Sequence, residues 1–372
     1  MKLTFPHLGN AFISVKVLLD EFKVDYVIPP FNNKKALEIG IKHSPEFACL
    51  PLKINIGNII EACNQGADTV LMAGGCGPCR FGYYGQLEKE ILKDAGYDLK
   101  FVNLDFPRTR DLIDYLKTMG KITNGFNVFE ITKAVRNTAK MSLMVDELER
   151  LTYKTRPREV KKGSVDRAYK SFLAEARKTK GFSNLKRLVK NTEKEINEIE
   201  IDNEFIPLKV GIVGEIYTTI DSNTSFNLDA RLGGLGVEVD RKVTISNWII
   251  EHMLKKYLPV SRDMSYAEAA KPYLGAMIGG HAQETIGNSV QYAKNGYDGI
   301  IQIYPLTCMP EIVAQSILPK VENDFDIPVL TLIIDEMTGE AGYLTRVEAF
   351  TDLLARRKEM SQINGKDLLP GY

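Results

Sequence analysis

Four of the five cysteines carry the chemistry that this sequence is expected to perform. Cys76 and Cys79 form a C-x-x-C pair, whereas Cys49 and Cys308 lie far from that pair along the chain. Such thiols offer three alternatives, namely an iron–sulfur cluster, a structural zinc ion or a redox-active dithiol. Closed zinc sites made of four cysteines usually contain two close pairs, and this sequence has one. A dithiol would use Cys76 and Cys79 alone and leaves the other two cysteines without a role.

The backbone around these cysteines is expected to be irregular. Pro45 and Pro51 flank Cys49, so we predict a loop there. Thioredoxin-type dithiol sites open a helix directly, whereas glycines interrupt the stretch Arg80–Gly85 that follows Cys79. An irregular backbone also leaves N–H groups free to donate to the sulfur atoms of a cluster. These points favour an iron–sulfur cluster, most simply one [4Fe–4S], while zinc and a dithiol remain alternatives.

The elements that position the cysteines follow an α/β pattern. An apolar run, Thr69–Ala73, leads into Cys76 and predicts a buried strand of a parallel sheet. Ligands gather at the carboxyl edge of such sheets, which is where the next turn carries the thiols. Alternating strands and helices predict one Rossmann-like sheet over residues 1–125 and another over 206–372. Residues 126–205 lack strand signals and predict a charged helical segment between the two domains.

An internal repeat indicates that the two domains are related. The stretch Ile56–Asp68 matches Ile286–Asp298, with two glycines nine residues apart in both. Each block continues into an apolar strand followed by one of the four cysteines. The repeat also pairs Cys63 with Ala293, so we interpret Cys63 as a packed helix residue. The expected strands cover 1–6, 25–30, 69–73 and 99–105, and then 209–215, 236–240, 274–278, 299–304 and 328–335.

Composition excludes several classes of function. Lys+Arg and Asp+Glu number 48 each, so the global charge gives no reason to expect nucleic acid or a membrane as a partner. The first residues lack a signal-peptide pattern, and no apolar run approaches the roughly 20 residues that span a bilayer. ATP binding is not expected either, because no G-x-x-x-x-G-K-[ST] motif is present. We expect a cytoplasmic protein whose cysteines serve metal or redox chemistry.

Three further residues are candidates for catalytic roles. Arg80 would offset the negative charge of a cluster or bind an anionic substrate, and a surface salt bridge is the alternative. Glu336 follows the most apolar strand and would line a cleft between the domains, or else form an ion pair beside a helix. His281 lies near a strand end and would donate a proton, although a structural histidine is the commoner case.

Five segments together carry a resemblance to a known family, namely Cys49–Lys53, Gly74–Gly85, Gly280–Asn288, Tyr304–Glu311 and Ile334–Phe350. They resemble the 2-hydroxyacyl-CoA dehydratase subunit family, and more closely its stand-alone relatives that are related to acyl-CoA dehydratase activases. The resemblance covers nearly the whole chain and implies two Rossmann-like domains around a [4Fe–4S] cluster, which cysteines of both domains bind.

The resemblance also implies ligands and partners. Cys49, Cys79 and Cys308 match the cluster ligands of the family, and Cys76 fits the C-G-P-C pattern of the closer relatives. A separate dimeric ATPase is implied as the electron donor, and true dehydratases pair two unlike subunits that act on an acyl-CoA. The implied role is a lyase or reductase component acting on an acyl-CoA or another small molecule. A non-catalytic subunit with a structural metal site and a thiol–disulfide enzyme remain alternatives.

Overall fold

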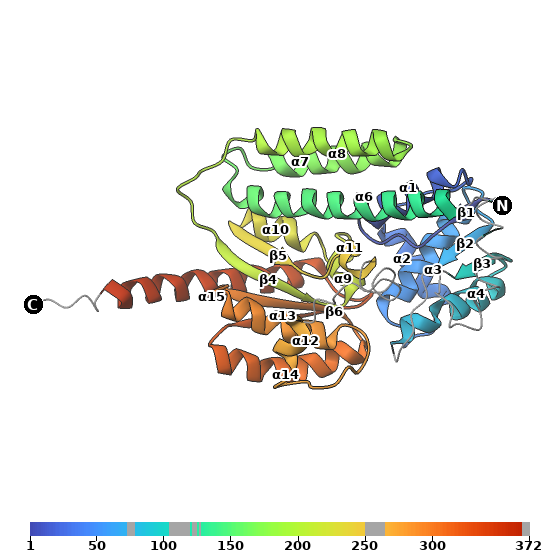
Figure 1. Cartoon of the computed structure of the whole chain (residues 1–372). Helices are drawn as coiled ribbons and strands as arrows, with labels where there is room; N and C mark the ends of the chain where they lie inside the picture. The colour runs from blue at the N-terminus through green and yellow to red at the C-terminus, as the bar shows by residue number, and fades with distance from the viewer. Residues whose placement is uncertain (73–78, 104–119, 121–124, 126–127, 250–264, 367–372) are drawn as a thin grey trace, which may run out of the picture.

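The computed structural model describes residues 1–72, 79–103, 120, 125, 128–249 and 265–366. Two separate parallel sheets, each accompanied by helices, make up most of these residues (Figure 1). This arrangement confirms the prediction of an α/β fold with two Rossmann-like sheets. None of the described helices combines the length and the apolar character needed to cross a membrane.

The first sheet has the strand order β1-β2-β3, with all neighbours parallel. Residues 25–30 do not form the predicted strand, because Tyr26 makes a single parallel bridge to Leu3 before two prolines, which lack the N–H that a ladder requires. The strands are β1 (Leu3–Thr4), β2 (Thr69–Met72) and β3 (Lys100–Asn103). The helices are α1 (Ala11–Glu21), α2 (Lys34–His43), α3 (Leu50–Cys63), the 3₁₀ helix η1 (Arg80–Tyr83) and α4 (Tyr84–Asp94).

The second sheet has the order β5-β4-β6-β7 and is also parallel. The strand predicted over 274–278 is wrong, because Leu274 and Ile278 pack against the apolar face of nearby helices and not into the sheet. The strands are β4 (Leu208–Gly214), β5 (Val237–Arg241), β6 (Gly299–Pro305) and β7 (Val329–Ile334). The helices are α9 (Ile216–Ile220), α10 (Leu228–Gly234), α11 (Ile245–Ile249), α12 (Ser265–Ala270), α13 (Ala282–Lys294), α14 (Met309–Phe325) and α15 (Glu340–Lys366).

The helical segment between the sheets contacts both of them. Its elements are α6 (Val128–Thr155), η2 (Arg156–Arg158), α7 (Ser164–Lys178) and α8 (Phe182–Asn197). Figure 1 shows α6 running past α1 at one end and past α10 and β5 at the other. Ser142 of α6 donates to Ser14 of α1 at 2.8 Å, while Glu149 of α6 pairs with Arg241 of β5. This helix therefore ties the two sheets together.

The internal repeat is present in the structure. The order of the Tyr26 bridge, β1, β2 and β3 matches the order β5-β4-β6-β7. The helix pair α2/α3 corresponds to the pair α12/α13. In each pair the two helices are in close contact at a glycine of the repeated stretch. A Cβ atom on Gly57 would lie 1.7 Å from the Ala36 carbonyl oxygen, and one on Gly287 would lie 1.9 Å from that of Tyr266. Only glycine permits this backbone approach in either domain.

We predict that Gly57→Ala and Gly287→Ala each destabilise the protein by about 1–3 kcal/mol, because the added methyl group forces the paired helices apart. Denaturant unfolding of the purified variants measures this loss. Gly342→Ala is the control, since this helical glycine has no atom within 4 Å of the new Cβ atom. Its stability should be unchanged or higher by up to about 1 kcal/mol. Equal stabilities for Gly57→Ala and Gly342→Ala would contradict the tight packing of α2 on α3.

Candidate functional site

Three of the four candidate cysteines occupy the same kind of position. Cys49, Cys79 and Cys308 are half-buried N-cap residues of α3, η1 and α14 respectively. Cys76 lies outside the described residues. The first turn of a helix presents N–H groups without intrahelical partners and a partial positive charge, and both favour an anionic sulfur. Cys63 is the last residue of α3 and packs beside Ile59 and Ile60, as its helical spacing predicts.

Of two local predictions near these cysteines, one holds only in part and the other is wrong. The stretch around Cys49 is not a loop throughout, because α3 begins at Leu50 and Pro51 lies in its first turn. Proline is tolerated there, since its missing N–H would have had no helical partner. The glycines of Arg80–Gly85 do not prevent helix formation either, because η1 begins directly after Cys79 and continues into α4. This helix removes one argument that had separated the site from a thioredoxin-type dithiol.

One guanidinium group joins the loops of all three cysteines. Arg80, which follows Cys79, donates to the carbonyl oxygens of Phe47 at 3.2 Å and of Thr307 at 2.5 Å. It also donates to the Thr307 hydroxyl group at 2.9 Å. Phe47 stands two residues before one of the other cysteines, and Thr307 directly precedes the remaining one. Residues that are distant in the sequence are thereby held at one place.

The backbone of Thr307 is strained at this junction. Its φ of 71° lies in the left-handed region, which β-branched residues rarely adopt. Strain of this kind persists where surrounding contacts enforce it, and it is concentrated at functional sites. Here both hydrogen bonds from Arg80 to Thr307 hold the turn that leads into Cys308.

Burial raises the pKa of all three thiols. The pKa of Cys49 rises to about 11, and those of Cys79 and Cys308 also rise. The Glu215 carboxylate raises each pKa further, whereas Arg80 lowers those of Cys49 and Cys79. The charge of Cys79 also raises the pKa of Cys308, which indicates that these thiols of opposite domains are neighbours. Without a metal the thiols are therefore protonated at neutral pH.

Hydrogen-bond donors nevertheless approach each sulfur atom. The backbone N–H groups of Leu52, Phe81 and Glu311 lower the pKa of the thiol that precedes each of them. The Tyr84 hydroxyl group contacts the sulfur of Cys49 and lowers its pKa as well. Donors to sulfur are among the features by which a protein tunes a bound cluster.

Glu215 belongs to the site but was not among the predicted residues. It follows β4 and caps α9, where its carboxylate accepts from the N–H groups of Tyr217 and Thr218, both at 3.0 Å. Burial raises its pKa, and the nearby His281 lowers it. In the sequence Glu215 is recognisable only as an acidic residue at the end of an apolar strand. No sequence pattern indicates that it lies beside the cysteines.

The two other predicted catalytic residues lie in different surroundings. Glu336 follows β7 and forms an ion pair with the buried Lys53 of α3, whose ammonium group also donates to the Glu46 carbonyl oxygen at 3.0 Å. It therefore has the ion-paired role that was the alternative prediction, between elements of the two domains. His281 is the N-cap residue of α13 and stands 3.9 Å from the Glu284 carboxylate.

The chemistry of the donor set fits an iron–sulfur cluster. Among the residues that the structure describes, no three His, Cys, Asp or Glu side chains form a group that is arranged around one ion. In a [4Fe–4S] cluster each cysteine binds a different iron atom, so the thiolates are not required to converge on one point. Soft thiolate ligands from both sheets, with N–H donors beside them, have the chemistry that such a cluster requires.

Two fully buried carboxyl groups lie on helices that follow Cys79 and Cys308 along the chain. Glu88 of α4 accepts from the Asn55 amide at 3.0 Å, and burial raises its pKa to about 8. Glu311 of α14 accepts from Thr285 and Gln302, both at 3.0 Å, and burial raises its pKa to about 7. In the folded protein Glu88 is therefore largely protonated at neutral pH, and Glu311 is largely protonated below neutral pH.

The raised pKa of Glu88 predicts a pH-dependent stability. Between about pH 5 and 8 this carboxyl group ionises in the unfolded chain but stays protonated in the folded one, so stability falls as pH rises. The Glu88→Gln side chain has the same shape and cannot ionise. The free energy of unfolding of this variant should therefore fall less than that of the wild type over this pH range, by on the order of 3 kcal/mol. The exposed Glu90→Gln on the same helix should keep the wild-type slope in urea unfolding curves. Parallel slopes for both variants would contradict the prediction.

Comparisons with models of known protein families and with curated proteins find no match to this chain. The function is therefore inferred from the geometry of the site and from the resemblance of its sequence segments. The geometry and the resemblance agree on one feature, which is a set of cysteines that come from both domains and lie where the two domains meet.

Proposed function

We propose that the protein is the iron–sulfur component of an ATP-driven, low-potential electron-transfer system related to the 2-hydroxyacyl-CoA dehydratases. Its [4Fe–4S] cluster would be held by Cys49, Cys79 and Cys308, with Cys76 as the fourth ligand. The observation that carries this proposal is the link made by Arg80, which joins the loops of three helix-capping cysteines from both domains. Sequence resemblance supports the same ligands.

The residues around the thiols have roles that suit such a cluster. When bound, the cluster supplies one-electron chemistry at low potential. Arg80 offsets negative charge at the thiolates, and the N–H groups of the three helix N-termini donate toward the sulfur atoms. Tyr84 is buried against Cys49 and limits the access of water from that side. His281 is the candidate proton donor, and Glu336 holds the domain contact with Lys53.

The resemblance completes the proposal with partners. A separate ATPase would deliver the electrons, a similar second subunit is a further candidate partner, and the reaction would be a dehydration or a reduction of an acyl-CoA or another small molecule in the cytoplasm. We infer no nucleic-acid or membrane partner, because the positive and negative formal charges are equal in number.

One observation favours a second candidate function. Because η1 begins directly after Cys79, the C-G-P-C pair could act as a thiol–disulfide oxidoreductase of the kind that opens a helix. That function needs only Cys76 and Cys79 and would operate without iron. It gives no role to Cys49 and Cys308, although Arg80 connects both of their loops to Cys79.

Iron content distinguishes the two functions. Protein purified without oxygen should be brown and contain roughly four iron atoms per chain. Cys49→Ser, Cys79→Ser and Cys308→Ser should each lose most of the iron, because each removes one ligand from the cluster. Cys63→Ser is the matched control and should keep wild-type iron content, since Cys63 lies at the far end of α3. Metal analysis and electron paramagnetic resonance of the dithionite-reduced protein provide the measurements.

Two results would overturn the proposal. One is a colourless protein with stoichiometric zinc. The other is disulfide reductase activity in air that survives Cys49→Ser and Cys308→Ser but not Cys79→Ser, which would establish the dithiol function instead. Thermal unfolding of each variant separates loss of the metal from loss of the fold.

A further inference from the structure

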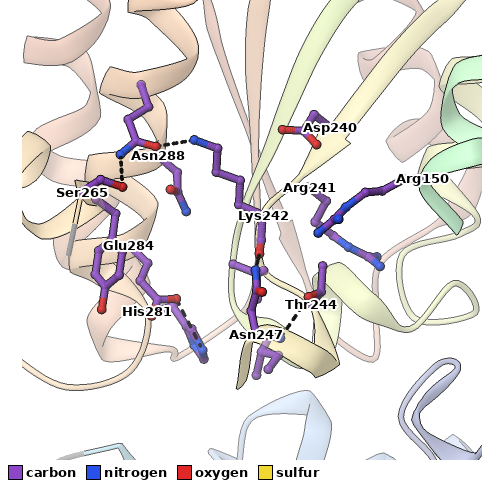
Figure 2. A pocket seen from close by; sticks show the side chains of 14 residues that line it. Arg150, Asp240, Arg241, Lys242, Thr244, Asn247, Ser265, His281, Glu284 and Asn288 are labelled. Atoms are coloured by element: carbon purple, nitrogen blue, oxygen red, sulfur yellow. Dashed lines mark hydrogen bonds and ion pairs between the residues drawn. The ribbon is translucent and has the colours of Figure 1, made fainter. Parts of the chain in front are cut away.

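A cavity of about 370 Å³ opens at the carboxyl edge of the second sheet (Figure 2). The residues after β5 form one wall, α12 and α13 form the opposite wall, and α6 contributes Arg150. Ile216 and His281 also line it, and these residues lie beside Glu215 and therefore near the cysteines. A volume of this size is in the range of small-molecule sites in proteins.

Asn288 gives the cavity a polar group that the protein does not satisfy. Its side chain is 6 % exposed and makes no hydrogen bond within the part of the chain that the structure describes. The repeat pairs it with Asn58, whose amide donates to the Pro30 carbonyl oxygen at 2.9 Å and accepts from the His7 N–H group at 3.0 Å. In the first domain this asparagine thus fixes the segment that follows β1 and the segment that follows the Tyr26 bridge. In the second domain the equivalent segments line the cavity, and the asparagine faces open space.

Arg150 adds positive charge at the same cavity. Its exposed guanidinium group makes no hydrogen bond or ion pair within the described ranges. Other polar side chains of the wall are already fixed, since Lys242 contacts Gln291, and Gln291 donates to the Ser265 hydroxyl group at 3.0 Å. The cavity therefore combines a rigid polar wall with two groups that are available to a ligand.

The charged side chains around Arg150 indicate which chemical groups a ligand of this cavity would carry. Arg241 also lines the cavity, but it is paired with Glu149 of α6. Asp240 and Glu284 line it as well, and their carboxylates would face hydrogen-bond donors of a ligand. A guanidinium group binds carboxylate and phosphate oxygens through paired N–H donors, and an amide such as that of Asn288 both donates and accepts.

We infer that this cavity binds a small polar molecule through a carboxylate or phosphate group, with Arg150 and Asn288 as the recognising residues. The inference goes beyond the proposed cluster and does not depend on it, because none of the described residues that line the cavity is a cysteine. A ligand bound here would lie next to His281, which is close enough to Glu215 to lower the pKa of that carboxyl group.

Anion titrations test this inference. Isothermal titration calorimetry and thermal-shift titration use inorganic phosphate and succinate as probes, at constant ionic strength with chloride as the balancing anion. Wild-type protein should show saturable binding of at least one probe, and the probe that binds tells phosphate from carboxylate recognition. Arg150→Ala should weaken this binding at least about tenfold. Asn288→Asp should also weaken binding, because it replaces the amide by a carboxylate of similar shape that repels the anion.

Arg136→Ala is the matched control for Arg150→Ala. Arg136 is an exposed arginine of the same helix α6, about 21 Å away along the helix axis, and its loss should leave binding unchanged. Arg150 is exposed, so its variant tests the inference even where Asn288→Asp fails to fold. Absence of saturable binding of both probes to the wild type would overturn the inference. Equal weakening by Arg136→Ala and Arg150→Ala would overturn it as well, since it would mean a diffuse effect of charge.

Discussion

The site depends on the close approach of two sheet edges. In a parallel sheet all strands end at one edge, and the helices that follow them begin there. The two carboxyl edges meet where the Tyr217 hydroxyl group donates to the His7 carbonyl oxygen at 2.8 Å and the Gly9 N–H group donates to Asp221 at 3.2 Å. A Cβ atom on Gly9 would lie 2.6 Å from the Ile220 carbonyl oxygen, so a side chain there would push the edges apart. This approach brings cysteines of different domains close to one another.

The electrostatics of the meeting place oppose free thiolates. Burial and Glu215 raise the pKa of the thiols, whereas Arg80 and the helix N–H groups act in the opposite direction on a smaller scale. A metal that replaces the thiol protons brings positive charge to the same place, which offsets the cost of burying the thiolates. Because its ligands come from both domains, such a group would also stabilise their contact. Binding of a metal by these thiols and docking of the two domains would then stabilise each other.

Sequence patterns predicted the elements better than the contacts between them. Apolar runs and the repeat predicted two related parallel sheets, because strand and helix periodicity is local. Proline and glycine misled the prediction around Cys49 and Cys79, since Pro51 is harmful only inside a helix and Gly82 does not prevent a 3₁₀ turn. The ion pair between Lys53 and Glu336 joins residues 283 positions apart, and only the docked domains bring them together. No local pattern contains that information.

The two copies of the repeated unit differ in how they use the same edge. In the first domain the His7 ring packs against Phe12 and Phe31, with centroids 5.9 and 5.1 Å apart, and Arg177 of α7 lies over the Phe31 ring at 4.9 Å. Burial lowers the pKa of His7 to about 4, so this packed histidine is neutral. Among the described residues that line the cavity of the second domain, Tyr266 is the one Phe, Tyr or Trp side chain. The helical segment thus packs onto the aromatic cluster of the first domain, whereas the equivalent edge of the second domain lines the cavity beside Arg150.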